Sequence, residues 1–312
     1  MENSFVHPYM PNSVPENKKA MLDELGINSV EDIYKSIIPD ELLYKERLDI
    51  PEPIRSEYEL KRHVMGILNR DITTEEYTSF LGAGCYKHQV PAICDEINSR
   101  GEFLTAYCGD TYSDHGKMQA IFEYTSMMGE LLDTDVVSYT TYDGGQAVAS
   151  SLRMAVRAVR EKGMAGKVIL VPKTMNPEIY SQVVQYCRNV AEVRKIAYEP
   201  ETGLMDLEEL KEQLAKKNVA AVFFENPTYL GNFETRGEEI AKLAHDAGAY
   251  CVVQTEVAAL GIMESPVNQG ADIVCGDIQP LGMHIQFGGG QAGFIACNQN
   301  MDLVEQFPTY MY

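Results

Sequence analysis

From residue 168 onward, short apolar segments alternate with amphipathic ones, and this alternation constrains the fold more than any other feature of the chain. Each apolar segment has the length of a β-strand, and each amphipathic segment has helical spacing. Such alternation predicts an α/β layered fold with a mainly parallel sheet. The predicted strands are 168–172, 193–198, 220–225, 250–254, 273–275 and 293–297, and the predicted helices are 116–132, 144–162, 177–188, 207–217 and 237–247.

Residues 1–100 have a different pattern, in which short helical segments are separated by turns. We therefore predict a helical N-terminal segment over 1–100, followed by one large α/β domain over 101–312. A total of 312 residues is enough for one large domain and its core. The Met-rich stretch between Met118 and Met128 is predicted to contribute to that core.

The composition excludes several classes of function. The chain has 46 acidic and 26 basic residues, a formal net charge of −20. Such a chain repels nucleic-acid phosphates and anionic membrane surfaces, so neither is expected as a partner. An apolar share of 45% argues against disorder. No apolar run reaches membrane-spanning length, and the segment MENSFVHPYMPN does not resemble a signal peptide.

The seven cysteines contain no CxxC pair, so no zinc or other metal site is predicted. Scattered thiols with apolar neighbours are typical of reduced core residues in the cytosol, with a disulfide framework as the alternative. We therefore expect a cytoplasmic protein.

Four segments could carry chemistry, and their order is more informative than any one of them. They are YDGGQA (142–147), FFENPTYLGNFE (223–234), QTEVAALG (254–261) and GDIQPLGMHIQFGGGQAGF (276–294). A Gly-Gly helix start can form a phosphate cup, although a plain turn before a helix has the same sequence. The order of a Gly-rich helix start, an Asn-Pro strand end, an acidic strand end and a Gly-rich loop resembles the large domain of fold-type I pyridoxal-phosphate enzymes.

In enzymes of that fold, the Lys that forms a Schiff base with pyridoxal phosphate follows the acidic strand end. Here that strand end is Glu256, and the last Lys of the chain is Lys242. The final 70 residues contain no Lys or Arg. We therefore predict no catalytic residue on this chain, because the Schiff-base Lys is absent.

The chain resembles the α subunits (subunit 1) of the two-subunit glycine dehydrogenase (decarboxylating), the P-protein of the glycine cleavage system. The resemblance extends over most of the chain, and the block from 80 to 107 is its most specific part. The matching stretches are HPYMPN, MLDELGINSVEDIY, FLGAGCYKHQVPAICDEINSRGEFLTAY, MQAIFEYTSMMGELLDTDV, YDGGQA and GDIQPLGMHIQFGGGQAGF.

The resemblance implies an enzyme subunit of a heterotetramer. Glycine would be decarboxylated, and its aminomethyl group would pass to the lipoyl arm of a carrier H-protein. Pyridoxal phosphate would be held by the Lys of a partner β subunit, and this chain would keep a shared or vestigial copy of the site. A catalytically silent scaffold or regulatory protein with the same fold is the alternative.

The resemblance also implies cofactor-site residues. We expect Tyr107 and Tyr142 to contribute an aromatic face and a hydroxyl, with simple packing as the alternative. His284 lies near the position of the lost Lys, where it could stack or form an interface. We interpret His88 as structural or interfacial, with a catalytic role as the alternative. The complete predicted set is Tyr107, Tyr142, Asp143, Gly144, Gly145, Glu256 and His284.

Three departures from the family pattern stand out. Residues 108–116 form a shorter and different loop, which leaves the substrate open. Glu256-Val257 stands where the family has Asp-Pro. The family's small C-terminal domain is expected to be absent from this chain.

Overall fold

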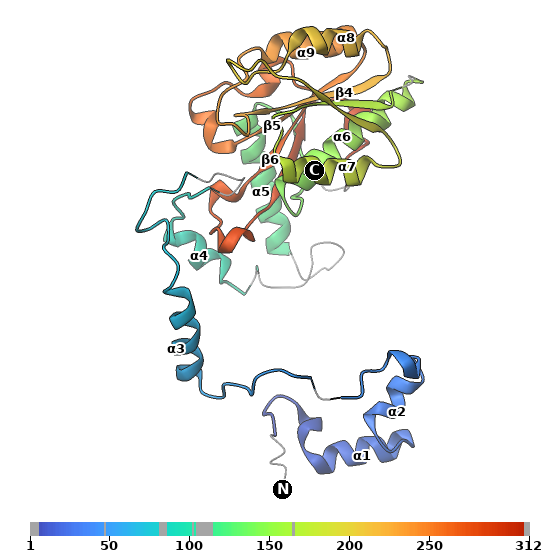
Figure 1. Ribbon diagram of the computed structural model, residues 1–312, viewed down its shortest axis with the longest axis vertical. Coiled ribbons are helices and arrows are strands. Elements are labelled where there is room, and N and C mark those ends of the chain that lie inside the picture. The colour runs from blue at the N-terminus through green and yellow to red at the C-terminus, as the bar shows by residue number, and fades with distance from the viewer. Residues whose placement is uncertain are drawn as a thin grey trace. The chain divides into compact units, whose positions relative to one another are not determined.

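The structure is a computed structural model that describes residues 6–46, 48–80, 86–101, 103, 115–163 and 166–308, without the side chains of 115–117. The chain divides into two units, Met1–Ile72 and Thr73–Tyr312 (Figure 1). The boundary near residue 100 between a helical segment and the large domain remains a prediction.

The first unit is built from short helices and buries nothing within its described residues. Its α-helices are α1 (Pro15–Leu25), α2 (Val30–Lys35) and α3 (Glu57–Leu68). The Ser56 hydroxyl caps α3 by accepting a hydrogen bond from the Glu59 amide. No residue of the three helices is buried. Because packing normally provides most of a short helix's stability, these three helices gain little stability from burial.

The second unit contains one seven-stranded sheet. Its strand order is β1-β7-β6-β5-β4-β2-β3. β7 is antiparallel to both of its neighbours, and the other neighbouring strands run parallel. The strands are β1 (Val136–Val137), β2 (Val168–Pro172), β3 (Glu192–Ile196), β4 (Val219–Asn226), β5 (Tyr250–Thr255), β6 (Ile273–Asp277) and β7 (Gly293–Cys297). The prediction of a mainly parallel α/β sheet is therefore confirmed.

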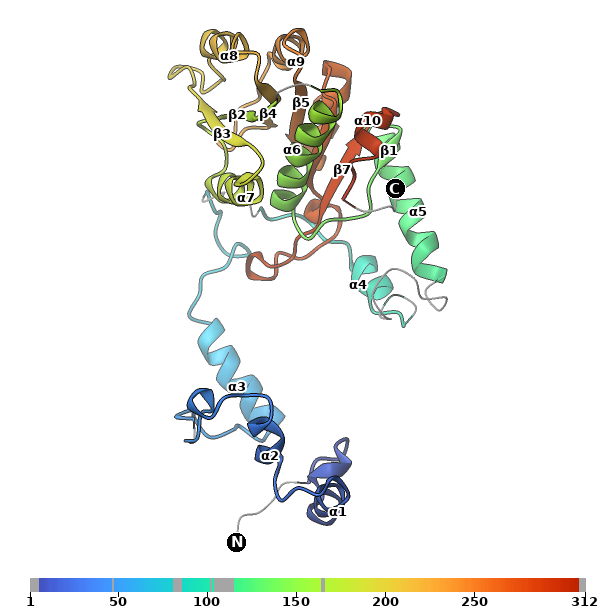
Figure 2. The same ribbon diagram turned by 90° about the vertical axis from the view of Figure 1, so that its right-hand side faces the viewer.

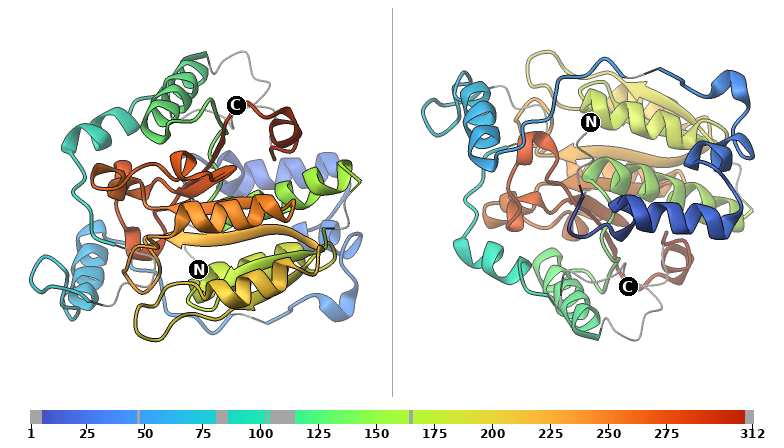
Figure 3. Two further views of the ribbon diagram at one scale, coloured as in Figure 1. Left: turned by 90° about the horizontal axis from the view of Figure 1, so that it is seen from above. Right: turned by 90° about the horizontal axis from the view of Figure 1, so that it is seen from below.

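Helices cover both faces of this sheet. Figures 2 and 3 show α6 and α7 over one face and α8 and α9 over the other. All five predicted helices are present, with ends that differ by a few residues. The helices of this unit are α4 (Ala92–Asn98), α5 (His115–Leu132), α6 (Gly144–Glu161), α7 (Pro177–Cys187), α8 (Leu207–Leu214), α9 (Gly237–Asp246) and α10 (Met301–Val304).

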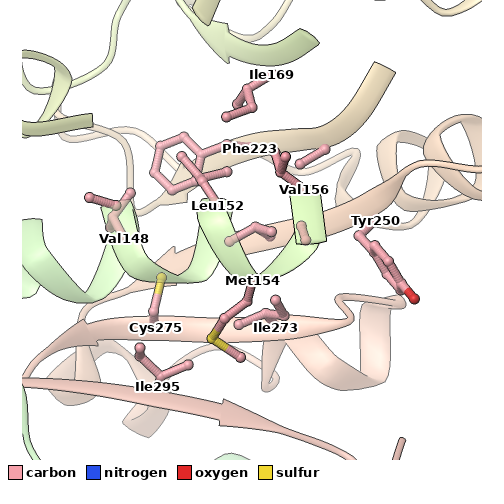
Figure 4. Close-up of a cluster of buried hydrophobic side chains, with 14 of the residues drawn as sticks. Val148, Leu152, Met154, Val156, Ile169, Phe223, Tyr250, Ile273, Cys275 and Ile295 are labelled. Atoms are coloured by element: carbon pink, nitrogen blue, oxygen red, sulfur yellow. The ribbon is translucent and has the colours of Figure 1, made fainter. Parts of the chain in front are cut away.

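The core has two parts, one on each side of the sheet. Successive strand residues alternate between them: Phe223 packs with α6 and α7, whereas Phe224 packs with α8 and α9. Figure 4 shows the first part, where Leu152 of α6 lies among side chains of the strands. The prediction that the Met-rich stretch is core is correct for Met128, which is 2% exposed, and wrong for Met118, which is exposed.

Two further observations concern the whole described chain. Within the described residues, no helix combines the length and the apolar character needed to cross a bilayer. Four of the free cysteines are buried, namely Cys187, Cys251, Cys275 and Cys297.

Candidate functional site

A cavity of about 400 Å³ opens in the second unit, at the edge of the sheet where the parallel strands end. Its walls come from the carboxyl ends of β4, β5 and β6, the residues that follow β2, β4 and β5, the first turns of α6 and α7, and the segment that contains Tyr86 and His88. Open α/β sheets bind their ligands at this edge. The cavity is therefore the candidate functional site.

The first turn of α6 forms one wall. Asp143 caps this helix, and its Oδ1 accepts a hydrogen bond from the backbone amide of Gln146 at 2.5 Å. The amide of Gly144 donates to Oδ2 of Asp277 at 3.0 Å. Gly145 lies against Gln182 of α7, where an added Cβ would stand 2.6 Å from Gln182 Nε2.

Asp277, the last residue of β6, uses both of its carboxylate oxygens. Besides the hydrogen bond from Gly144 to Oδ2, its Oδ1 accepts a hydrogen bond from the backbone amide of Gln279 at 2.7 Å. Burial raises the pKa of Asp277, and the nearby charge of Asp143 adds to the increase. The carboxylate thus ties the end of β6 to the start of α6.

Glu225, near the end of β4, is 5% exposed and lines the cavity. Its Oε1 accepts a bond from the Asn176 amide at 3.1 Å, and its Oε2 accepts one from the Tyr229 amide at 3.3 Å. Burial raises the pKa of Glu225 to about 7. Two backbone donors therefore only partly offset the cost of burying this carboxylate.

Glu256, the residue after β5, is also in the lining. Its Oε1 accepts a hydrogen bond from the Ala258 amide at 3.4 Å, which caps the 3-10 turn Val257–Gly261. Burial raises the pKa of Glu256, and the charge of Asp277 contributes to the increase. The acidic strand end predicted from the sequence therefore faces the cavity.

The cavity is acidic. The described lining residues include neither Lys nor Arg. Its carboxyl groups come from Asp143, Glu178, Glu225, Glu256 and Asp277. His88 also lines it, and among the described residues its Nε2 has no hydrogen-bond partner; burial lowers the pKa of this imidazole. Within the described chain, no group of three or more His, Cys, Asp or Glu is arranged to hold a metal ion.

The structure places the predicted site residues unevenly. Asp143, Gly144, Gly145 and Glu256 lie together in the cavity wall. Tyr142 and His284 are not among the lining residues. Tyr142 is 75% exposed, and His284 contacts Asp95 at 3.0 Å away from the lining. Tyr107 lies outside the described residues.

Several lining residues were not predicted as site residues. Asp277 and Glu225 lie within segments that the sequence marked as possible chemistry carriers, at strand ends. Both carboxyl groups could have been predicted from their position at the carboxyl end of a strand, where open α/β sheets bind ligands. Gln182 lies in the middle of a helix, and no local pattern indicates its place in the wall.

The strand order, the single antiparallel strand and the cavity at the carboxyl edge define the large domain of fold-type I pyridoxal-phosphate enzymes. Comparison with known proteins identifies a particular family within this fold. The sequence matches the family described as "Glycine cleavage system P-protein" over residues 7–311. The chain belongs to this family.

Individual relatives agree with this assignment. A Staphylothermus marinus protein named "Probable glycine dehydrogenase (decarboxylating) subunit 1" is 36% identical over 97% of this chain and 64% of its own length. A Pyrococcus horikoshii protein of the same name is 38% identical over 96% and 65%. The crystal structure titled glycine decarboxylase (P-protein) of the glycine cleavage system, in inhibitor-bound form, superposes with a TM-score of 0.78. It is 31% identical and covers 97% of this chain and 64% of that one. The chain thus spans 64–65% of the length of these two curated relatives.

The residues of this cavity do not fit pyridoxal phosphate, the cofactor of the fold. That cofactor requires a Lys for its aldehyde and a favourable seat for a phosphate dianion. The described lining contains no Lys, and its charged side chains other than histidine are all carboxyl groups. No catalytic step is therefore assigned to the cofactor on this chain.

Proposed function

We propose that this chain is the subunit without the catalytic Lys in a pyridoxal-phosphate-dependent glycine decarboxylase. In this proposal, a β subunit carries the Lys and the cofactor, glycine loses carbon dioxide, and the aminomethyl group passes to the lipoyl arm of H-protein. Membership of the P-protein family and the word "subunit" in the relatives' names support the proposal.

The observation that carries the proposal is a cavity at the expected edge of the sheet without the residue that would make it self-sufficient. Glu256 stands at the acidic strand end, yet no Lys follows Lys242 in the sequence. In this proposal the partner subunit supplies the Lys.

The contribution of this chain is structural and electrostatic. We assign Asp143, Gly144, Gly145 and Glu256 to a vestigial cofactor site. Tyr107, Tyr142 and His284 are proposed as residues of the site shared with the partner, in a heterotetramer. The buried free thiols support a reducing, cytoplasmic location, because such thiols are typical of proteins kept in a reducing compartment.

Reconstitution with the Lys-bearing subunit tests this function. The two chains are co-expressed, and glycine-dependent exchange of labelled carbon dioxide is measured in the presence of lipoylated H-protein. The pair should catalyse exchange, and each chain alone should be much slower. The control replaces the partner's Schiff-base Lys with Ala, which should abolish the activity of the pair.

Two results would contradict the proposal. If the partner alone is as fast as the pair, this chain is a scaffold or regulator instead. If the isolated chain retains pyridoxal phosphate through gel filtration, with the absorption band of a Schiff base, it is not the subunit without the Lys.

A further inference from the structure

Phosphate groups bind at helix N-termini because the first backbone amides have no partner within the helix and because the helix dipole favours negative charge. α6 has the length and the Gly-Gly start that such a seat requires, and its first turn faces the cavity. What matters is whether these amides are available to a ligand.

In this chain, carboxylates already accept hydrogen bonds from two of these amides. Asp143 bonds the Gln146 amide, as an ordinary cap does. The bond from Gly144 to Asp277 is different, because Asp277 arrives from the end of β6, 133 residues further along the chain. A strand thus delivers an anionic group to the place where a ligand phosphate would bind.

Contacts within the protein explain why Gly144 and Gly145 carry no side chain. A Cβ at Gly144 would stand 3.1 Å from Cβ of Asp277 and 3.2 Å from its backbone nitrogen. A Cβ at Gly145 would meet the side-chain amide of Gln182 at 2.6 to 2.7 Å. The missing side chains therefore admit β6 and α7 to the helix start, and the same space is closed to a phosphate.

The charged side chains around the start of α6 also disfavour phosphate binding. Glu178, Glu225 and Glu256 line the same cavity, and none of the described lining residues is a Lys or Arg that could neutralise a phosphate. A dianion entering here would lose its hydration and meet further carboxyl groups, which is unfavourable.

We infer that the carboxylate of Asp277 occupies the phosphate seat at the start of α6, so that this chain's cavity excludes pyridoxal phosphate and other phosphate monoesters. The inference deepens the proposed function, and it rests on that function in taking the cofactor of the fold as the ligand whose seat is closed. Asp277 acts as an internal substitute for the phosphate.

The test measures anion binding by the full-length chain in the absence of glycine, H-protein and partner. Inorganic phosphate and pyridoxal phosphate are titrated separately into the wild type and the Asp277→Ala and Glu256→Gln variants by calorimetry. The wild type should show no saturable binding of either. Asp277→Ala frees the Gly144 amide and should bind inorganic phosphate at least tenfold more tightly than the wild type.

Glu256→Gln is the matched control, because it removes a carboxyl from the same cavity but leaves the bond from Gly144 to Asp277 in place. It should bind phosphate no better than the wild type. An equal gain in both variants would show that net charge alone excludes the anion, and it would overturn the inference. Saturable phosphate or cofactor binding at the seat in the wild type would also overturn it.

Asp277→Asn covers the case in which the Ala variant does not fold. It keeps the shape and one acceptor oxygen while removing the charge, so a smaller gain in phosphate affinity is expected. A folded Asn variant with no gain, together with an Ala variant that phosphate does not stabilise against heat, would refute the role of Asp277. Glycine exchange by the reconstituted pair is a separate measurement, so inorganic phosphate binding by the wild type, or the absence of a gain in the Asp277 variants, overturns the inference and leaves the proposed function standing.

Discussion

Glu225 illustrates how a single buried carboxyl affects the energy of the whole domain. It is held between the Asn176 and Tyr229 amides, and burial raises its pKa to about 7. An unfolded Glu ionises near pH 4.5, so the native state binds more protons between that pH and about 7. Stability therefore falls as pH rises through this window.

Glu225→Gln should remove this pH dependence. Relative to the variant, the wild type is expected to lose about 2 kcal/mol of unfolding free energy between pH 5 and pH 8, since each pKa unit is equivalent to about 1.4 kcal/mol. Urea unfolding at the two pH values measures the difference. The exposed Glu305→Gln serves as control and should follow the wild type. Parallel pH profiles for wild type and Glu225→Gln would contradict the assignment.

For single residues, the sequence predicted those site residues that a short motif of neighbouring positions identifies. Asp143, Gly144 and Gly145 are adjacent in the chain, and Glu256 directly follows an apolar strand, so both groups could be identified. Asp277 could not be placed opposite Gly144, because the contact joins segments 133 residues apart. Tyr142 and His284 were expected in the site because of family resemblance, and the structure leaves both outside the cavity wall.

Among the secondary-structure elements, the sequence predicted strands with a continuous apolar run and helices with regularly spaced apolar residues. The fully buried strands β2 and β7 have exactly the predicted bounds. β1, by contrast, has two residues and was not predicted, because a strand that short has no period to detect. Its existence depends on pairing with β7, which the sequence of β1 alone does not encode.

Gly276 of β6 shows how closely β5 and β6 approach each other beside the cavity. An added Cβ there would stand 2.3 Å from the Thr255 carbonyl oxygen. Gly276→Ala should therefore destabilise the domain by about 1–3 kcal/mol, the usual cost of overpacking. Gly261→Ala is the control, because no atom lies within 4 Å of its added Cβ. Urea unfolding should separate the two variants, and equal midpoints would show that β6 and β5 can move apart freely.

On the scale of the whole molecule, stability is concentrated in the second unit. Among the described residues, every buried side chain belongs to the range 128–307, and the first unit contributes none. A chain that begins at Thr73 retains both parts of the core.

Truncation tests this division. A chain of residues 73–312 should unfold cooperatively with the same thermal midpoint as the full chain, within error. A chain that begins at residue 134 should not, because it lacks α5 and with it the buried Met128 and Leu132. Circular dichroism during heating follows both. If the chain of residues 73–312 loses the cooperative transition, the first unit is part of the folding unit.

The two ends of the sheet have a consequence for assembly. Of the described strands, β1 at one edge has only two residues, and β3 at the other carries Glu192, Arg194 and Lys195. Short or charged edge strands hinder pairing with a strand of another molecule, and so guard against edge-to-edge aggregation. Among the described strands the hydrogen-bonded ladder ends at β1 and β3, and we expect association with another chain to use helices and loops instead of a continuous intermolecular sheet.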